Sequence, residues 1–267
     1  MTDSGAIIWY ELMTSDGAGA KTFYDKVIGW DIQNHGAASP NGAQYSFIMR
    51  SDGKPNGGML ELTPEMQAQG AKPGWFSYIH VLDVDDAVER VTKAGGSVYM
   101  PATDMPQVGR FALVADPWGA PFYVMTPVPP EDDPDAQSDV FSVEQPQHCR
   151  WNQLQTSEPE AAIAFYCDLF GWRQEGSMPM GELGDYNFIQ HDGTGIGAIM
   201  PLMPDVPQPV WSYFFGVDDI DRAVRAVENC GGTLDSPVQE IPGGEFSAHC
   251  FDPQGAGFGL VGPRKGA

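Results

Sequence analysis

The chain carries one sequence pattern twice, and this internal repeat restricts the possible folds more than any other feature. Residues 9–30 (WYELMTSDGAGAKTFYDKVIGW) align without gaps with residues 151–172 (WNQLQTSEPEAAIAFYCDLFGW), and nine of the 22 positions are identical. Further matches pair residues 85–101 with 221–237, and residues 115–122 with 251–258. Self-similarity on this scale indicates two homologous domains.

The octapeptides FYDKVIGW (residues 23–30) and FYCDLFGW (165–172) are each predicted to be the end of a helix. Apolar residues in the first copy recur at the spacing of one helix face, and Gly29 supplies a left-handed residue that ends the helix. In the second copy, Ser157 and Glu160 are expected to form a capping box at the helix start. The aromatic residues of the octapeptides are therefore predicted to hold a helix against a sheet.

Each half of the chain also divides in two. A strand-like run, an amphipathic helix and three further strand-like runs occur, and the pattern then restarts within the same half. The sequence thus predicts an α+β protein built from four βαβββ modules. We expect a first domain over residues 1–127, an acidic, proline-rich linker over 128–147 and a second domain over 148–264. The expected strands include IIWYELM, DIQNH, YSFIMR, GGMLELT, WFSYIHVL, SVYM, RFALVA, PFYVMTP, HCRWNQLQ, WSYFFGV, TLDSP, FSAHCF and GFGLVGP.

The charge balance excludes some classes of partner. The chain has 14 Lys and Arg against 36 Asp and Glu, a formal net charge of −22. Such a surface repels phosphate backbones and anionic lipids, so we expect neither nucleic acid nor membrane partners. The N-terminal residues lack the pattern of a signal peptide, and the four cysteines form no CxxC pair. We therefore expect a cytoplasmic protein, either a monomer or a homodimer.

Four paired βαβββ modules resemble the vicinal oxygen chelate (VOC) superfamily of glyoxalase I, bleomycin and fosfomycin resistance proteins, and extradiol dioxygenases. The phrases "FYxxxxGW", "VDDxDxAV…GG" and "GRFALVADPWGAPF" are similar to those of its two-domain, glyoxalase-like members. The resemblance implies that the modules pair into two half-barrel domains with a ligand inside each cup. It leaves the activity open, because this fold hosts lyases, isomerases, oxygenases and drug-binding proteins.

The resemblance also implies where a divalent metal would be held. One ligand comes from the first strand of a module, seven residues before the acidic residue that opens the helix. The other comes from the last strand, four residues after the glycine of a DPxG turn. The residues expected at the first-strand positions are Trp9, Phe76, Trp151 and Ser212, and those at the last-strand positions are Glu61, Tyr123, Pro201 and Gly259. Only Glu61 among them is a good metal ligand.

A displaced site remains possible in the first half. Alternate residues of a strand face the same way, so Glu11 is expected to lie on the face of Trp9, and Tyr78 and His80 on the face of Phe76. We expect Glu11 and His80 to face one cavity as an acid–base pair, and with Glu61 they could bind a metal. The alternative for His80 is a core histidine hydrogen-bonded to Glu11 or to the backbone.

Two functions remain open at this point. In the first, the protein binds a small, partly aromatic molecule in the first cup without a metal. In the second, it is a metal-dependent glyoxalase-type lyase or isomerase, or a dioxygenase-like enzyme, in which a metal held by Glu11, Glu61 and His80 polarises an oxygen. The cofactor is accordingly none or one divalent metal ion. The expected ligand-binding residues are Trp9, Phe76, Tyr78, Tyr123, Trp151 and Gln153, the last two in the second cup.

Overall fold

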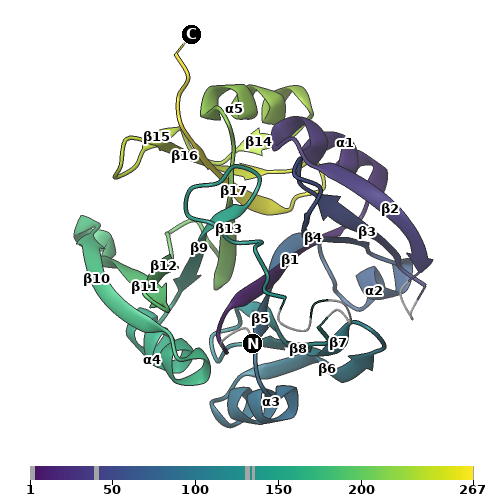
Figure 1. The fold of residues 1–267 in the computed structure, drawn as a ribbon. Helices are drawn as coiled ribbons and strands as arrows, with labels where there is room; N and C mark the ends of the chain where they lie inside the picture. The colour runs from purple at the N-terminus through teal and green to yellow at the C-terminus, as the bar shows by residue number, and fades with distance from the viewer. Residues whose placement is uncertain (1–3, 39–41, 130–132, 134–135, 267) are drawn as a thin grey trace. The chain divides into compact units, whose positions relative to one another are not determined.

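The computed structural model describes residues 4–38, 42–129, 133 and 136–266. In these residues the chain forms four successive βαβββ modules (Figure 1), which confirms the predicted α+β class. The first module comprises β1 (Ile7–Thr14), α1 (Gly17–Val27), β2 (Asp31–Ala38), β3 (Gln44–Met49) and β4 (Pro55–Glu61). The second comprises β5 (Gly74–His80), α3 (Val84–Lys93), β6 (Ser97–Met105), β7 (Gly109–Ala115) and β8 (Pro121–Pro127).

The second half repeats this order. The third module comprises β9 (Cys149–Thr156), α4 (Pro159–Phe170), β10 (Arg173–Pro179), β11 (Asp185–His191) and β12 (Thr194–Pro201). The fourth comprises β13 (Val210–Gly216), α5 (Ile220–Asn229), β14 (Thr233–Leu234), β15 (Gln239–Glu240), β16 (Phe246–Phe251) and β17 (Gly257–Gly262). Its two-residue strand β15, which pairs with β16, is an addition to the βαβββ order. The short helices α2 (Pro64–Ala68) and η1 (Gly181–Leu183) were not predicted, and the run TLDSP forms only the two-residue strand β14.

Within each module the first strand lies beside the last one. The strand orders are β2-β3-β4-β1, β5-β8-β7-β6, β10-β11-β12-β9 and β13-β17-β16-β14. The first and last strands run parallel, whereas the other neighbours in a module are antiparallel. Parallel neighbours need a crossover between them, and in each module this crossover contains the helix.

The helix ends follow from local sequence. Asp16 caps α1 by accepting a hydrogen bond from the backbone N–H of Gly19, and Gly29 adopts φ +87° after the last turn, as predicted. The predicted capping box of α4 is wrong. Glu158 is the N-cap there and makes no side-chain capping bond, because Pro159 supplies the first helical residue with its φ already fixed.

The residues fall into two compact units, each of which combines a module from either half. Unit 1 is Met1–Ile8, Phe76–Asp139 and Trp151–Trp211, and unit 2 is Trp9–Trp75, Val140–Arg150 and Ser212–Ala267. In unit 1, α3 packs against α4, and in unit 2, α1 packs against α5. The domain bounds at residues 127 and 148 stay a prediction.

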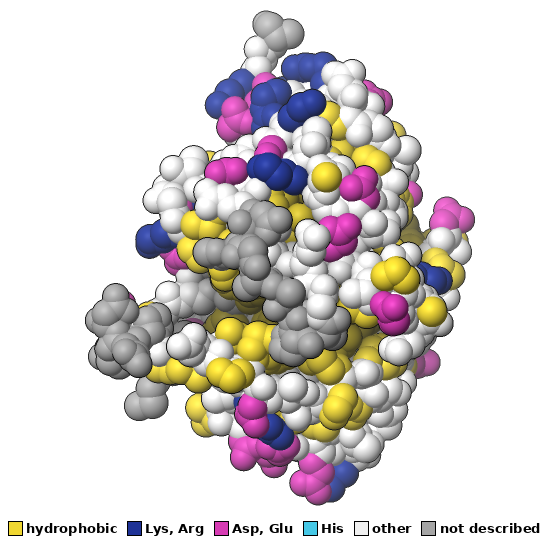
Figure 2. All heavy atoms as spheres, turned by 90° about the vertical axis from the view of Figure 1, so that its right-hand side faces the viewer, with side chains coloured by type: hydrophobic (Ala, Val, Ile, Leu, Met, Phe, Trp, Pro, Cys, Tyr) yellow, Lys and Arg dark blue, Asp and Glu magenta, His cyan; other side chains and the backbone are white. Residues whose placement is uncertain are grey.

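The basic side chains are mostly matched with acidic ones, and Figure 2 shows blue and magenta side chains side by side on one face. Ion pairs join Arg90 with Asp168, Arg150 with Glu245, and Arg264 with Asp221. Because most of the few basic side chains are paired with acidic ones, the charge that remains unpaired on the surface is negative. No helix in the described part of the chain is long and apolar enough to cross a membrane.

Candidate functional site

In the second and fourth modules, the DPxG turn identifies the last-strand position. The residue of the first strand that pairs with this position can therefore be read from the structure. Tyr78, two residues after Phe76, pairs with Tyr123, which is the last-strand position implied by the family resemblance. In the fourth module Phe214 pairs with Gly259, which is the same position there. In both modules the last-strand position therefore lies opposite the residue two places after the first-strand position.

The first and third modules lack a DPxG turn, but they have the same register. Glu11, two residues after Trp9, pairs with Gly58, and Gln153 pairs with Ala198. The last-strand positions are therefore Gly58 and Ala198. The residues expected there from sequence lie three places further along, where Glu61 pairs with Thr14 and Pro201 pairs with Thr156.

Glu61 consequently faces the helix side of its sheet. An added Cβ on Gly17, the first residue of α1, would lie 2.8 Å from Oε2 of Glu61. The carboxylate thus lies at the N-terminus of α1, where the helix dipole favours a negative charge. Because Glu11 lies three residues before Thr14 on β1, its side chain is directed to the other face of the sheet.

These positions do not fit the family's metal set. The last-strand positions hold Gly58, Tyr123, Ala198 and Gly259, none of which is an imidazole, carboxylate or thiolate. Among the described residues, no three or more His, Cys, Asp or Glu side chains are grouped closely enough to hold a metal ion. Glu11 and Glu61 belong to unit 2 and His80 to unit 1, so the joint site of these three residues stays a prediction, which the register of Glu61 does not favour.

Aromatic rings occupy the corresponding face of the second module. Tyr78 and Tyr123 stack face to face, with centroids 4.1 Å apart and planes 2° apart. Phe76 packs edge-on against Tyr123 at 6.2 Å, and Phe111 lies 6.0 Å from Tyr78. Both tyrosines are buried, whereas Phe76 is half-buried. We call these four residues the aromatic wall.

His80 lies at the end of the same strand. It is 7% exposed and pairs with Met125 of β8. Its backbone N–H donates to the carbonyl of Ala6, and its carbonyl accepts from the N–H of Gly5, each at 2.8 Å. Because β5 is continuous from Gly74 to His80, strand alternation puts residue 80 on the face of Tyr78, and the pairing of His80 with Glu11 stays a prediction.

The first module carries a tryptophan–tyrosine pair on the face of Glu11. The Nε1–H of Trp9 donates to the hydroxyl of Tyr45 at 3.0 Å. That hydroxyl lies over Gly58, because a Cβ added there would collide with it. Glu11 itself is 4% exposed. A buried carboxylate beside an aromatic pair is suited to holding a polar group of a ligand.

The third module repeats this pair, and Gln153 joins it there. The Nε1–H of Trp151 donates to the hydroxyl of Tyr186 at 2.6 Å, and that hydroxyl donates to Oε1 of Gln153 at 3.0 Å. Burial raises the pKa of Tyr186, so its hydroxyl stays protonated. Tyr45 and Tyr186 were not predicted as site residues, although the repeated phrases QYSF and DYNF (residues 44–47 and 185–188) mark both of them.

In the fourth module, a histidine packs against the aromatic residue of the first strand that pairs with the last-strand position. The ring of Phe214 lies over Gly259, where an added Cβ would overlap it. The imidazole of His249 packs edge-on against Phe214 with centroids 4.8 Å apart. Burial lowers the pKa of His249, and the charge of Asp235 partly opposes this shift. His249 is therefore neutral near pH 7.

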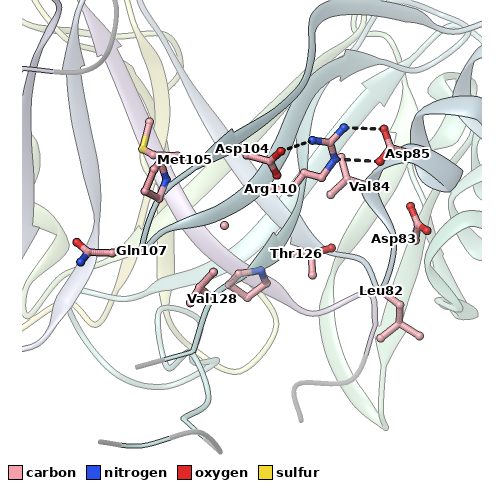
Figure 3. A pocket seen from close by; sticks show the side chains of 13 residues that line it. Leu82, Asp83, Val84, Asp85, Asp104, Met105, Gln107, Arg110, Thr126 and Val128 are labelled. Atoms are coloured by element: carbon pink, nitrogen blue, oxygen red, sulfur yellow. Dashed lines mark hydrogen bonds and ion pairs between the residues drawn. The ribbon is translucent and has the colours of Figure 1, made fainter. Parts of the chain in front are cut away.

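Two cavities lie away from these faces, one in each unit. The cavity in unit 1 has a volume of about 570 Å³ and is lined by residues of β6, β7 and the start of α3 (Figure 3). Arg110 is held there between Asp85 and Asp104 by hydrogen bonds of 2.8 to 2.9 Å. The cavity in unit 2, of about 530 Å³, is lined in part by Arg50, His148 and other residues. None of the predicted site residues lines either cavity.

The sequence profile of the Glyoxalase/Bleomycin resistance protein/Dioxygenase superfamily matches residues 6–124 and 145–260, so the chain belongs to this family. It is 30% identical over 256 residues to the Mycobacterium tuberculosis protein named "Putative glyoxylase CFP32", covering 96% of this chain and 94% of that protein. It is 29% identical over 279 residues to "Anthracycline biosynthesis protein DnrV" of Streptomyces peucetius, covering 98% and 94% of the two chains.

Solved structures share the fold at low sequence identity. The Mn(II)-bound glyoxalase from Novosphingobium aromaticivorans matches with a TM-score of 0.63 and 14% identity over 98% of this chain and 83% of that chain. A homoprotocatechuate 2,3-dioxygenase variant from B. fuscum matches with a TM-score of 0.63 and 15% identity over 97% and 71%. At these identities the likeness concerns the fold alone.

Proposed function

We propose that the protein binds a small, partly aromatic organic molecule and does so without the family's usual metal set. The proposed binding surfaces in the first half are two, one in each unit: the face of the first module that carries Trp9, and the aromatic wall of the second module. The observation that supports this most strongly is the stack of Tyr78 on Tyr123. In this stack, Tyr123 occupies the last-strand position, at which the family would place a metal-binding carboxylate.

The physical basis of this proposal is the aromatic surface that Phe76 leaves accessible to a ligand. Phe76 is half-buried, and its ring already packs edge-on against Tyr123. An aromatic ligand that covers Phe76 gains from burial of apolar surface and from edge-to-face contacts, at little cost in side-chain entropy. The curated relative named for anthracycline biosynthesis supports a ligand with aromatic rings.

Calorimetric titration with 2-naphthol tests this proposal. Phe76→Ala is expected to weaken binding about ten-fold, because a ring contact of about 1.4 kcal/mol is lost. Phe251→Ala is the matched control, because Phe251 is 41% exposed and lies on β16, away from the aromatic wall. Equal affinities of the two variants, or no binding to the unaltered protein, would contradict the proposal.

A second candidate is a metal-dependent enzyme of the glyoxalase type, which is supported by the buried carboxylate of Glu11 and by the names of the relatives. Glu11 and His80 would then hold a divalent metal, which would polarise an oxygen of the substrate, and a carboxylate would move the proton. Glu11→Gln separates the two candidates. This variant should abolish metal uptake if the protein is such an enzyme, but merely weaken ligand binding if it is not.

A further inference from the structure

We propose that the third module carries a second binding site, in which Gln153 donates a hydrogen bond to the carbonyl oxygen of a planar, uncharged aromatic ketone. This site presupposes the proposed function, namely that the module faces bind aromatic molecules. It adds which chemical group of the ligand is recognised and which residue recognises it.

A chain of hydrogen bonds determines the orientation of the Gln153 amide. The indole nitrogen of Trp151 can only donate, so the hydroxyl of Tyr186 accepts from it at 2.6 Å. The single proton of that hydroxyl is then available for Gln153, whose Oε1 accepts it at 3.0 Å. The amide oxygen is thereby assigned as the acceptor, and the amide nitrogen points away from Tyr186.

The amide nitrogen of Gln153 can donate a hydrogen bond to a ligand. Gln153 is 6% exposed, and within the described residues its Nε2 makes no hydrogen bond. This nitrogen is not one of the fully buried polar atoms that lack a partner, so it is accessible from outside the protein, and a carbonyl oxygen can accept its hydrogen bond there. Because Tyr186 already holds the amide in place, little side-chain entropy is lost when a ligand binds.

The surroundings of this amide select a flat, apolar ligand body. Trp151, Tyr186 and Phe188 are all half-buried. The ring of Phe188 packs edge-on to the other two, with centroids 6.3 Å from Trp151 and 5.9 Å from Tyr186. Such rings present both faces and edges to an aromatic ligand.

The strands of this face favour an uncharged ligand. β12 contains no ionisable side chain, Tyr186 of β11 stays protonated, and the other ionisable residues of β11, Asp185 and His191, lie at its two ends. Arg150 of β9 is already paired with Glu245. An ionised ligand at Gln153 would therefore lose water without gaining a counter-charge from these strands. The first module differs at this point, because Glu11 stands at the position of Gln153 and can accept a hydrogen bond but not donate one when ionised.

Side-chain amide NMR of the ¹⁵N-labelled full-length protein tests the proposal directly. The Gln153 NH₂ signals are identified by their loss in Gln153→Met, which keeps the volume of the side chain. The probes are 1-indanone, a planar aromatic ketone, and indane, which has the same rings without the carbonyl. We expect the Gln153 signals to shift to saturation with 1-indanone and to shift much less with indane.

The variants add an affinity measurement. Gln153→Met and Gln153→Glu should each weaken 1-indanone binding about three- to ten-fold, with indane binding unchanged, because both lack the amide donor. The proposal is overturned if 1-indanone does not bind, if it saturates without moving the Gln153 signals, or if both variants lose ketone and hydrocarbon binding equally. Phe76→Ala, which tests the proposed function, should leave the Gln153 shifts unchanged, so failure of one proposal is distinguishable from failure of the other.

Discussion

The hydroxyl of Tyr24 donates a hydrogen bond to Oδ2 of Asp252 at 3.1 Å, although the two residues are 228 positions apart in the chain. Unit 1 contains the same contact between Tyr166 and Asp116, at 3.0 Å. In each case the tyrosine of the repeated octapeptide bonds to the aspartate of a DPxG turn from the other half of the chain. Each copy of the octapeptide therefore contacts a module of the other half of the chain.

Tyr24→Phe should destabilise the protein by about 1–3 kcal/mol. The change removes the donor to Asp252 and also the acceptor for Nε1–H of Trp75, which lies 2.9 Å from the Tyr24 hydroxyl. Both groups are buried, so water does not replace the lost partner. Chemical denaturation monitored by circular dichroism measures the effect. The control is Tyr99→Phe, because Tyr99 is 60% exposed, and equal stability of the two variants would contradict the prediction.

Asp252 should make stability depend on pH. Burial raises its pKa above the ordinary value of 3.8, although hydrogen bonds from Ala256, Tyr24 and Gln254 oppose the shift. The folded state thus binds the proton more tightly than the unfolded chain does. Its contribution is fully present below pH 3.8 and is lost as the pH rises through the raised pKa.

Asp252→Asn isolates this contribution, because the amide resembles the protonated carboxyl group. The unfolding free energy of the unaltered protein relative to this variant should fall as the pH rises above about 4 and then level off. Urea denaturation at a series of pH values provides the comparison. A difference that is constant, or that grows with pH, would show that Asp252 is not the group responsible.

Gly58→Ala should disturb the first module selectively. The added Cβ would collide with the hydroxyl of Tyr45, which would then move away from Nε1 of Trp9. We expect a loss of about 1–3 kcal/mol in stability, as for other overpacked sites, together with altered tryptophan fluorescence. At the matching position of the third module, Ala198 already has a Cβ, so Ala198→Gly should leave the fluorescence nearly unchanged. Unaltered fluorescence of Gly58→Ala would contradict the placement of Tyr45.

Local patterns in the sequence predicted the elements of this fold. The apolar spacing before Gly29 and Gly171 marked two helix ends, and both glycines adopt positive φ. The contact of Tyr24 with Asp252 could not be predicted in this way, because it depends on how a helix meets a turn from the other half of the chain. The octapeptide therefore identified Tyr24 as a core residue without revealing its partner.

The candidate site was predictable only where a turn marked the strand register. The DPxG turn places Tyr123 and Gly259 in the same register relative to their first strands. β4 and β12 follow different turns, and the positions expected there lie three residues beyond that register. An odd shift moves a side chain to the opposite face of a sheet, which is why Glu61 lies against α1. Tyr45 and Tyr186 come from neighbouring strands, and only the comparison of QYSF with DYNF could have identified them.

The most direct test of the account is the metal content of the protein purified without a histidine tag. Because the last-strand positions hold Gly58, Tyr123, Ala198 and Gly259, we predict well under one equivalent of Mn, Fe, Co, Ni or Zn per chain after incubation with each ion and desalting. Elemental analysis by mass spectrometry gives the number. One equivalent of a divalent metal per chain, lost in Glu11→Gln, would contradict the account and favour the metal-dependent enzyme.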